Sequence, residues 1–364
     1  MMSLTLGVTV PAGAQVAVTV DTAPAVDIPG TGPSGRVVFE VAVGATRLSS
    51  GTVVVADRGA SALRFFDRNG QPVRAVGRRG SGPNEFRRVD WLGQCGPDSL
   101  YVWDRVGQQL SVIDSAGRFV YQGRFPGDTG VRGVPISLSC SRNGVLVLLM
   151  SAPIKPAPEA PFLERGRSNV VRTTSRGTDL RVVTAVPGSE RVALEDAILA
   201  SPLGRTTSVA VWKDRLYVGT GDKAAVSVYV LDGALITTLP VGIATRKPTR
   251  QEFDLAIDRL PRPTAQDLWV PMRDRLQRLP LPEVLPPYRK VYVDPEGLLW
   301  AVVSPDGAGS TALAVVDAAG RTVGNVVLPR TVTVLDIDRE FILASYDDGA
   351  GEPHVLAFRI RRTR

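Results

Sequence analysis

Residues 53–58 read Val-Val-Val-Ala-Asp-Arg, and 47 positions later residues 100–105 read Leu-Tyr-Val-Trp-Asp-Arg. The same spacing joins a second pair of segments, 63–70 and 110–117, and both end in two apolar residues followed by Asp-x-x-Gly. This ending recurs at 315–320, in a shorter form at 230–233 and in a degenerate form at 174–177. A constant spacing over two separate motifs indicates an internal repeat of about 40–50 residues.

Each repeat predicts four short antiparallel strands. The segments around the motifs are rich in β-branched and aromatic residues, which favour strands. In the Asp-x-x-Gly turn the Asp accepts hydrogen bonds from the turn backbone, and the Gly adopts the positive φ that the turn needs. The second strands of the repeats are expected at 52–56, 99–103, 144–150, 215–219, 297–303 and 339–345. This rhythm predicts an all-β chain folded as a six-bladed β-propeller.

The ends of the chain suggest how the ring closes. The last repeat supplies three strands, the third at Val355 to Ile360, and then the chain stops. We therefore expect residues 36–41 to complete the last blade, since this removes an exposed sheet edge. The propeller then spans 36–364, and residues 15–35 are an N-terminal extension.

The N-terminus and the cysteines bear on the compartment. Residues 1–14 resemble the remnant of a signal peptide, with a small-residue cleavage pattern at Ala12-x-Ala14, although a frayed strand is the alternative. Cys95 and Cys140 each end the first strand of adjacent blades, so we expect a disulfide, with two buried thiols as the alternative. No apolar run reaches 18 residues, which argues against a membrane span. We expect a secreted or periplasmic protein.

The linker before the second repeat resembles a known family. Residues 77–86 read Gly-Arg-Arg-Gly-Ser-Gly-Pro-Asn-Glu-Phe, which is similar to the linker of NHL repeats, where glycines and Gly-Pro-x-Glu-Phe lead into the next inner strand. The likeness is good over residues 45–125 and faint beyond them. The chain resembles secreted bacterial six-bladed propellers of mostly unassigned function, so the resemblance implies the fold and hardly any function.

Two insertions interrupt the repeat. The first, 151–167, is rich in proline and lies between the second and third strands of the third blade. The second, 244–287, lies between blades 4 and 5, and its apolar spacing predicts helices starting near 248 and over 264–279. Loops of these two kinds emerge on the same face of a propeller, so we expect one face to carry both insertions and to bind the partner. Alternatively, the helices only cap the channel.

Arginines are predicted to gather near this face. The net charge is +7, and all but five of the 43 basic residues are Arg. Arg binds carboxylate and phosphate through paired hydrogen bonds. An even spread of arginines, or pairing with Asp57 and Asp104, is the alternative. The candidate ligand-binding residues are Arg78, Arg79, Arg87, Arg88, Asp90, Arg132, Arg205, Arg289 and Arg330.

No catalytic motif is recognised. The single histidine, His354, precludes a His-rich zinc site, and no Gly-x-Ser-x-Gly elbow accompanies it. The Gly30-x-Gly32-x-x-Gly35 pattern lacks the strand-helix setting of a dinucleotide site. We therefore expect a monomeric binding propeller that takes a protein, a peptide or an anionic glycan and no nucleic acid. No cofactor is expected. The alternative is a lactonase or lyase that uses a divalent metal such as calcium in the channel.

Overall fold

The computed structural model describes residues 17–363 apart from 33–34, 126–132, 142, 152–160, 175, 178, 195–196, 261–267 and 304–308. Over these residues the chain is built almost wholly of antiparallel strands, with two helices. Five four-stranded sheets and one five-stranded sheet follow the order of the chain. The helices are α1 (Arg250–Asp258) and α2 (Trp269–Gln277).

The strands of the first three sheets are β3 (Ala42–Arg47), β4 (Val53–Asp57), β5 (Ala62–Phe66), β6 (Pro72–Val76); β7 (Val89–Gly96), β8 (Ser99–Asp104), β9 (Gln109–Asp114), β10 (Phe119–Arg124); and β11 (Val134–Cys140), β12 (Leu146–Ser151), β14 (Arg167–Thr173), β15 (Arg181–Pro187). The next two sheets hold β18 (Ser208–Trp212), β19 (Arg215–Gly219), β20 (Ala225–Val230), β21 (Leu235–Pro240); and β22 (Tyr288–Val293), β23 (Leu299–Val303), β24 (Thr311–Val316), β25 (Thr322–Leu328). The last sheet holds β26 (Thr333–Ile337), β27 (Phe341–Asp347) and β28 (Pro353–Thr363), which pairs with β1 (Ala17–Val20) and β2 (Val26–Pro29).

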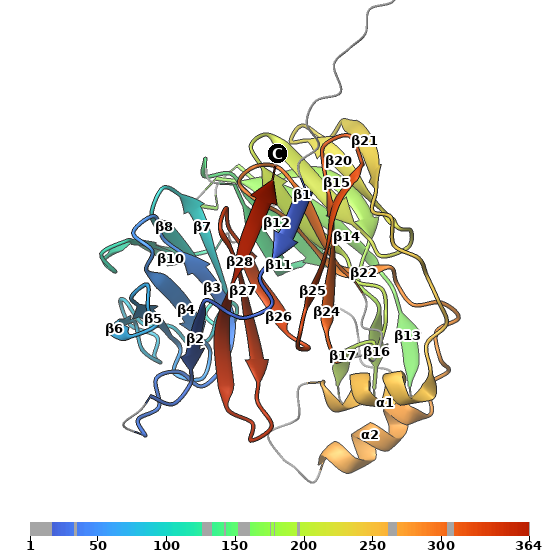
Figure 1. Cartoon of the computed structure of the whole chain (residues 1–364), viewed down its shortest axis with the longest axis horizontal. Helices are drawn as coiled ribbons and strands as arrows, with labels where there is room; N and C mark the ends of the chain where they lie inside the picture. The colour runs from blue at the N-terminus through green and yellow to red at the C-terminus, as the bar shows by residue number, and fades with distance from the viewer. Residues whose placement is uncertain are drawn as a thin grey trace, which may run out of the picture.

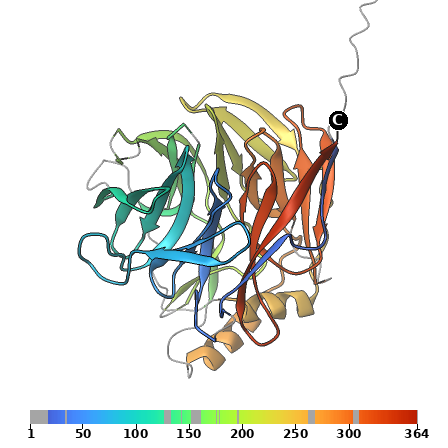
Figure 2. The same cartoon turned by 60° about the vertical axis from the view of Figure 1, so that its left-hand side comes forward.

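The sheets surround a central channel. Their first strands contact one another in the cyclic order β3, β7, β11, β18, β22, β26 and back to β3. Apolar clusters fill the spaces between neighbouring sheets, and Figure 2 shows the sheets grouped about a common axis. The predicted β-propeller fold is confirmed, and every expected second strand overlaps an observed one.

The repeated turns have the predicted geometry. The Asp67 carboxylate accepts hydrogen bonds from the backbone N–H groups of Asn69 and Gln71, both at 2.9 Å, and Gly70 has a φ of 83°. The turn at Asp317 and Gly320 repeats this arrangement, with a φ of 81° at the glycine. The Asp-x-x-Gly signature therefore marks tight turns between third and fourth strands.

The closing segment differs from the prediction. Residues 36–41 form no strand, and only an isolated bridge joins Val37 to Thr31. β1 and β2 pair instead with opposite ends of β28, as Figure 1 shows for β1. The 11-residue length of β28 explains this, because one long edge accommodates two short segments in succession. Residues 17–29 therefore belong to the last sheet and are not an extension.

The insertions build a separate layer at one end of the propeller. β13 (Phe162–Glu164) pairs with β16 (Arg191–Ala193), which pairs with β17 (Ile198–Ala200). α1 and α2 lie beside this small sheet in Figure 1, and Phe253, Ile257, Met272 and Leu276 share a buried cluster with Val192 of β16. We call the end of the propeller that carries this layer the insertion face.

Some expectations concern residues outside this description. The signal-peptide segment 1–14, Arg132, most of the proline-rich stretch and the start of the predicted helix at 264 all lie there. In the part of the chain that is described, no helix is both long and apolar enough to cross a membrane.

Candidate functional site

Three arginines converge on one carboxylate at the insertion face. Asp90, in β7, lies 3.3 Å from the Arg58 guanidinium and 3.0 Å from that of Arg88. The backbone N–H of Arg105 also donates to Asp90. Arg58 and Arg105 directly follow β4 and β8, while Arg88 directly precedes β7. Since these ends of the strands meet on the insertion face, three cationic residues surround a single Asp side chain that is 11% exposed.

Arg191 of β16 extends this cluster toward the insertion layer. Burial and the nearby charge of Arg105 lower the pKa of Arg191, against the opposing influence of Glu164 on β13. Burial also lowers the pKa of Arg58; Asp90 opposes this shift, and Arg88 and Arg105 add to it. The Arg58 Nε is buried and has no hydrogen-bond partner among the described residues. We call Arg58, Arg88, Arg105 and Arg191 the arginine group.

Among the described residues, the arginine group carries more positive charge than the neighbouring carboxylates neutralise. Arg58 and Arg88 pair with Asp90, and Glu164 is the carboxylate that acts on Arg191. Arg105 lies close enough for its charge to lower the pKa of both Arg58 and Arg191. Partly desolvated charges of one sign that lie close together create a local potential that attracts the opposite sign. The geometry is therefore suited to binding carboxylate or phosphate groups.

A second cationic place lies near the helices. Burial, together with the charge of Arg259, lowers the pKa of Arg289, the second residue of β22. Both arginines line a small cavity of about 60 Å³ beside α1. Because β7 and β22 are three places apart in the ring, this second place lies across the channel from the arginine group.

The other predicted residues have local partners. Arg78 pairs with Glu85 at 2.8 Å, and Arg79 donates to the Gly59 carbonyl. Arg87 donates to Ser81, Arg205 pairs with Glu190 at 2.8 Å, and the Arg330 guanidinium lies 4.6 Å from the ring centroid of Tyr346. The structure thus brings Arg88 and Asp90 together with residues that had not been proposed, and leaves Arg78, Arg79, Arg87, Arg205 and Arg330 in separate contacts.

The sequence contained a signal for the missed residues. Arg58 and Arg105 occupy the same position of the repeat, immediately after the Asp that ends the second strand. Those Asp side chains bind backbone, since Asp57 accepts from the N–H of Val41 and Asp104 from that of Arg87. Because the Asp carboxylate is already hydrogen-bonded to backbone, the side chain of the Arg that follows it can extend toward the mouth of the channel. The repeat gave no signal for Arg191, which lies in β16 beside the helices and not in a repeated strand.

The channel holds a cavity of about 490 Å³. Its walls come from the six first strands, and it extends to Asn143, Lys213 and Pro295 in the turns at the end opposite the insertion face. Asp294 and Asp336 are the carboxylates on its described walls. Asp294 already accepts from Trp300 and pairs with Arg362.

Potential metal ligands converge in another place. Within the described ranges, Asp348, Glu352 and His354 bring one ligand atom each within 4.8 Å of one another, beside the turn between β27 and β28. His354 also bonds Asp27 of β2 at 2.8 Å, and Glu352 accepts from the Thr31 backbone. These contacts give the side chains a structural role in fastening the N-terminal segment.

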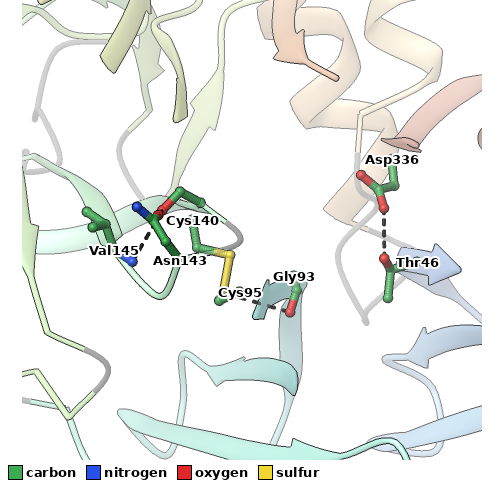
Figure 3. The surroundings of a disulfide bond; sticks show 8 residues. Thr46, Gly93, Cys95, Cys140, Asn143, Val145 and Asp336 are labelled. Atoms are coloured by element: carbon green, nitrogen blue, oxygen red, sulfur yellow. Dashed lines mark hydrogen bonds between the residues drawn. A yellow bond between two sulfur atoms is a disulfide. The ribbon is translucent and has the colours of Figure 1, made fainter. Parts of the chain in front are cut away.

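The predicted disulfide is confirmed. Cys95 and Cys140 are bonded, with their Cα atoms 5.3 Å apart, and Figure 3 shows the bond with Gly93 and Asn143 nearby. It joins the ends of the neighbouring first strands β7 and β11. We call this end of the channel the disulfide face.

Comparison with known proteins reveals likeness of fold. No known family matches the sequence, and no curated protein matches it significantly. A DUF4221 protein from Bacteroides vulgatus has a TM-score of 0.56 at 13% identity, over 96% of this chain and 100% of its own. A Bacteroides fragilis protein predicted to be exported has a TM-score of 0.51 at 11% identity, over 98% and 97%.

A more distant structure is a calcium-binding regucalcin from Agrobacterium tumefaciens, with a TM-score of 0.44 at 13% identity over 88% of this chain and 91% of its own. At these identities, similarity extends to the β-propeller fold and not to activity. The two Bacteroides structures therefore show a likeness of fold over almost the whole chain, at sequence identities of 13% and 11%.

Proposed function

We propose that this protein is a binding propeller that recognises an anionic partner, foremost an acidic segment of a protein, on its insertion face. The observation that supports this most directly is the arginine group around Asp90. Its members come from two neighbouring sheets and the insertion layer, so a rigid scaffold holds guanidiniums contributed by three parts of the chain. Preorganised arginines lose little conformational entropy when they bind a carboxylate.

Binding of a poly-glutamate peptide tests this proposal. Affinity is measured by fluorescence anisotropy for the wild type and for the double variant Arg58→Met, Arg105→Met. Losing two charge-assisted contacts should weaken binding by roughly tenfold or more, and the wild-type affinity should fall as salt rises. An anionic glycan such as polygalacturonate serves as the second probe, and tighter binding of it would identify a glycan as the partner.

A matched control is Arg78→Met. This arginine also lies on a loop between sheets, but its side chain is 82% exposed and pairs with Glu85 away from the arginine group. It should bind both probes as the wild type does. Equal affinities of the wild type and the double variant for both probes would contradict the proposal.

We propose two further features of the same protein. The six meander sheets are the blades of an NHL-like propeller, a reading supported by the buried Phe86 that ends the linker 77–86. The protein acts outside the cytoplasm, secreted or periplasmic, which the disulfide supports because such bonds persist in oxidising compartments.

A metal-dependent enzyme is the second candidate function, and the response to added calcium distinguishes it from a binding propeller. A metal ion in the channel would need several carboxylate or amide oxygens at the same height along the channel axis. Asp294, one of the carboxylates on the described wall, is already bonded to Trp300 and Arg362. Under the binding proposal, calcium leaves the Tm of the variant Asp348→Asn unchanged. A clear rise in that Tm would favour the enzyme, because the variant lacks the other convergent set of acidic ligands.

A further inference from the structure

The channel cavity is a second site, separate from the arginine group. Its volume of about 490 Å³ lies in the range of small-molecule pockets, roughly 300–1,000 Å³. It approaches the disulfide face, with Cys140 and Asn143 on its wall, whereas the arginine group lies at the other end. Apolar side chains such as Leu138, Val209 and Ile337 alternate with a few polar ones.

β-Bulges decide which side chains enter this cavity. In β3, β7, β11, β22 and β26 the pairing with the second strand shifts close to the start of the first strand. A bulge sets two residues against one and changes the direction of the side chains that follow. As a result Asp90 and Arg289 belong to the insertion face, while the next residues, Trp91 and Lys290, line the cavity.

Lys290 is a cation without a direct partner. Among the described residues it forms no ion pair, and its Nζ lies 4.5 Å from the ring centroid of Tyr292. Asp336, on the neighbouring strand β26, accepts a hydrogen bond from Thr46 at 2.8 Å, as Figure 3 shows. Burial lowers the pKa of Lys290 to about 8, and the charge of Asp336 only partly opposes this.

The surroundings of Lys290 explain how its side chain is both exposed and desolvated. Its surface is accessible because the cavity admits water. The strands of the ring nevertheless surround the channel, and the resulting partial desolvation of the ammonium is what lowers its pKa. An anion in the cavity would supply the partner that the protein lacks.

The opposite wall offers an acceptor and an aromatic surface. Gln94 of β7 has a buried Oε1 without a hydrogen-bond partner among the described residues. The Trp91 ring packs directly against Gly93, because a Cβ atom added to this glycine would lie only 2.4 Å from the ring carbons. Since β7 and β22 face each other across the ring, Gln94 and Lys290 lie on opposite walls.

We propose that this cavity binds a small aromatic carboxylic acid that carries a hydroxyl group at the end away from the carboxylate. The carboxylate pairs with Lys290, and the ring packs between Trp91 and the apolar walls. The Gln94 side chain turns toward the cavity on binding, so that its Oε1, which is buried in this structure, accepts from the hydroxyl. This site is independent of partner binding on the insertion face.

The probe for this site is 4-(hydroxymethyl)benzoate, measured by calorimetry. Two related probes isolate each contact: 4-(hydroxymethyl)benzamide lacks the charge, and 4-ethylbenzoate lacks the hydroxyl. We expect the amide to bind at least tenfold more weakly than the acid, because it loses a charge-assisted contact in a desolvated site. The ethyl compound should bind about three- to tenfold more weakly.

Variants assign the contacts to residues. Lys290→Met should weaken binding of the acid at least tenfold and leave the amide almost unaffected. Lys223→Met, which changes an exposed lysine outside the cavity wall, is the matched control and should bind as the wild type does. Gln94→Leu should remove the difference between the hydroxymethyl and ethyl compounds.

Either of two results would overturn the proposal. One is failure of the folded wild type to bind any of the three probes at millimolar concentration. The other is equal affinity of the wild type and of Lys290→Met for the acid, when thermal melts show that both proteins are folded. The poly-glutamate assay reports separately on the insertion face, so failure at one site is distinguishable from failure at the other.

Discussion

Single buried carboxylates organise the entry into each of the first two sheets. Asp104 is 1% exposed and accepts from the backbone N–H groups of Arg87 at 2.5 Å and Gly107 at 2.7 Å. It thereby fixes the start of β7, and with it the positions of Arg88 and Asp90. The repeat revealed these Asp residues, but their hydrogen-bond partners lie in loops, chiefly those that lead into the first strands, and could not be read from it.

Replacing Asp104 should therefore destabilise the fold strongly. Asp104→Ala leaves two backbone donors without partners, so we expect a loss of about 2–4 kcal/mol in the free energy of unfolding. Asp67→Ala, in a solvent-accessible turn, should cost about 1 kcal/mol or less. Urea denaturation of both variants measures the difference, and similar losses would show that Asp104 has no special role.

The lowered pKa of Lys290 predicts a pH dependence of binding in the channel. Below about pH 8 the ammonium is present, and a bound carboxylate stabilises it further. Above this pH, binding must take up a proton, so the affinity for 4-(hydroxymethyl)benzoate should fall as pH rises from about 7 to 9. The neighbouring charges are Asp336 on β26, Lys213 after β18 and Asp294 after β22.

Tyr292 stays neutral over this range, because burial raises its pKa. The amide should show no such dependence, since it makes no ion pair. Calorimetry in buffers of different ionisation enthalpy measures the proton uptake directly. An affinity for the acid that stays constant up to pH 9 would assign the carboxylate to a different partner.

At the scale of elements, local signals predicted α1 better than α2. Thr249 and Glu252 form a capping box, which sets the start of α1, and Phe253 and Ile257 give it a buried face. α2 (Trp269–Gln277) has no side-chain cap and ends two residues before the predicted end at 279, while its predicted start at 264 lies outside the described residues. β16 and β17 were missed because each is only three residues long and forms through tertiary pairing, β16 with β13 and β17 with β16.

The capping box predicts an acid-sensitive contribution to stability. The Arg246 guanidinium, helped by the Thr249 N–H, lowers the pKa of Glu252 from 4.5 to about 2. The contribution is thus present above pH 4.5 and is lost as pH falls toward 2. Glu252→Gln should lose about 1 kcal/mol at neutral pH and show less further loss in acid.

Thermal melts of this variant and the wild type at several pH values measure the effect. Glu283→Gln, an exposed residue in the same insertion, is the control and should follow the wild type. An identical acid response of wild type and Glu252→Gln would exclude Glu252 as the source.

At the scale of the molecule, pairing between the two ends of the chain holds the ring together. Val18 of β1 is 2% exposed and packs in a cluster with Trp300 of the preceding sheet. The prediction that an N-terminal strand completes the last sheet was correct in kind and wrong in position. Residues 36–41 have suitable strand composition, but choosing between them and 17–29 depends on the length of β28, which only tertiary pairing reveals.

The disulfide should add stability to this ring. It joins residues 45 positions apart, so replacing both cysteines by serine should lower the free energy of unfolding by roughly 3–4 kcal/mol. Because it lies on the disulfide face, the double variant should still bind poly-glutamate with wild-type affinity. Loss of that binding in a folded variant would mean that the two faces are coupled.

Hydrogen–deuterium exchange with bound poly-glutamate tests most directly whether the insertion face recognises anionic partners. The account predicts slower exchange in segments 57–61, 87–91, 104–109 and 188–194, which surround the arginine group. Protection confined to the turns of the disulfide face, at 47–52, 143–145 and 213–215, or no protection at saturating peptide, would contradict it.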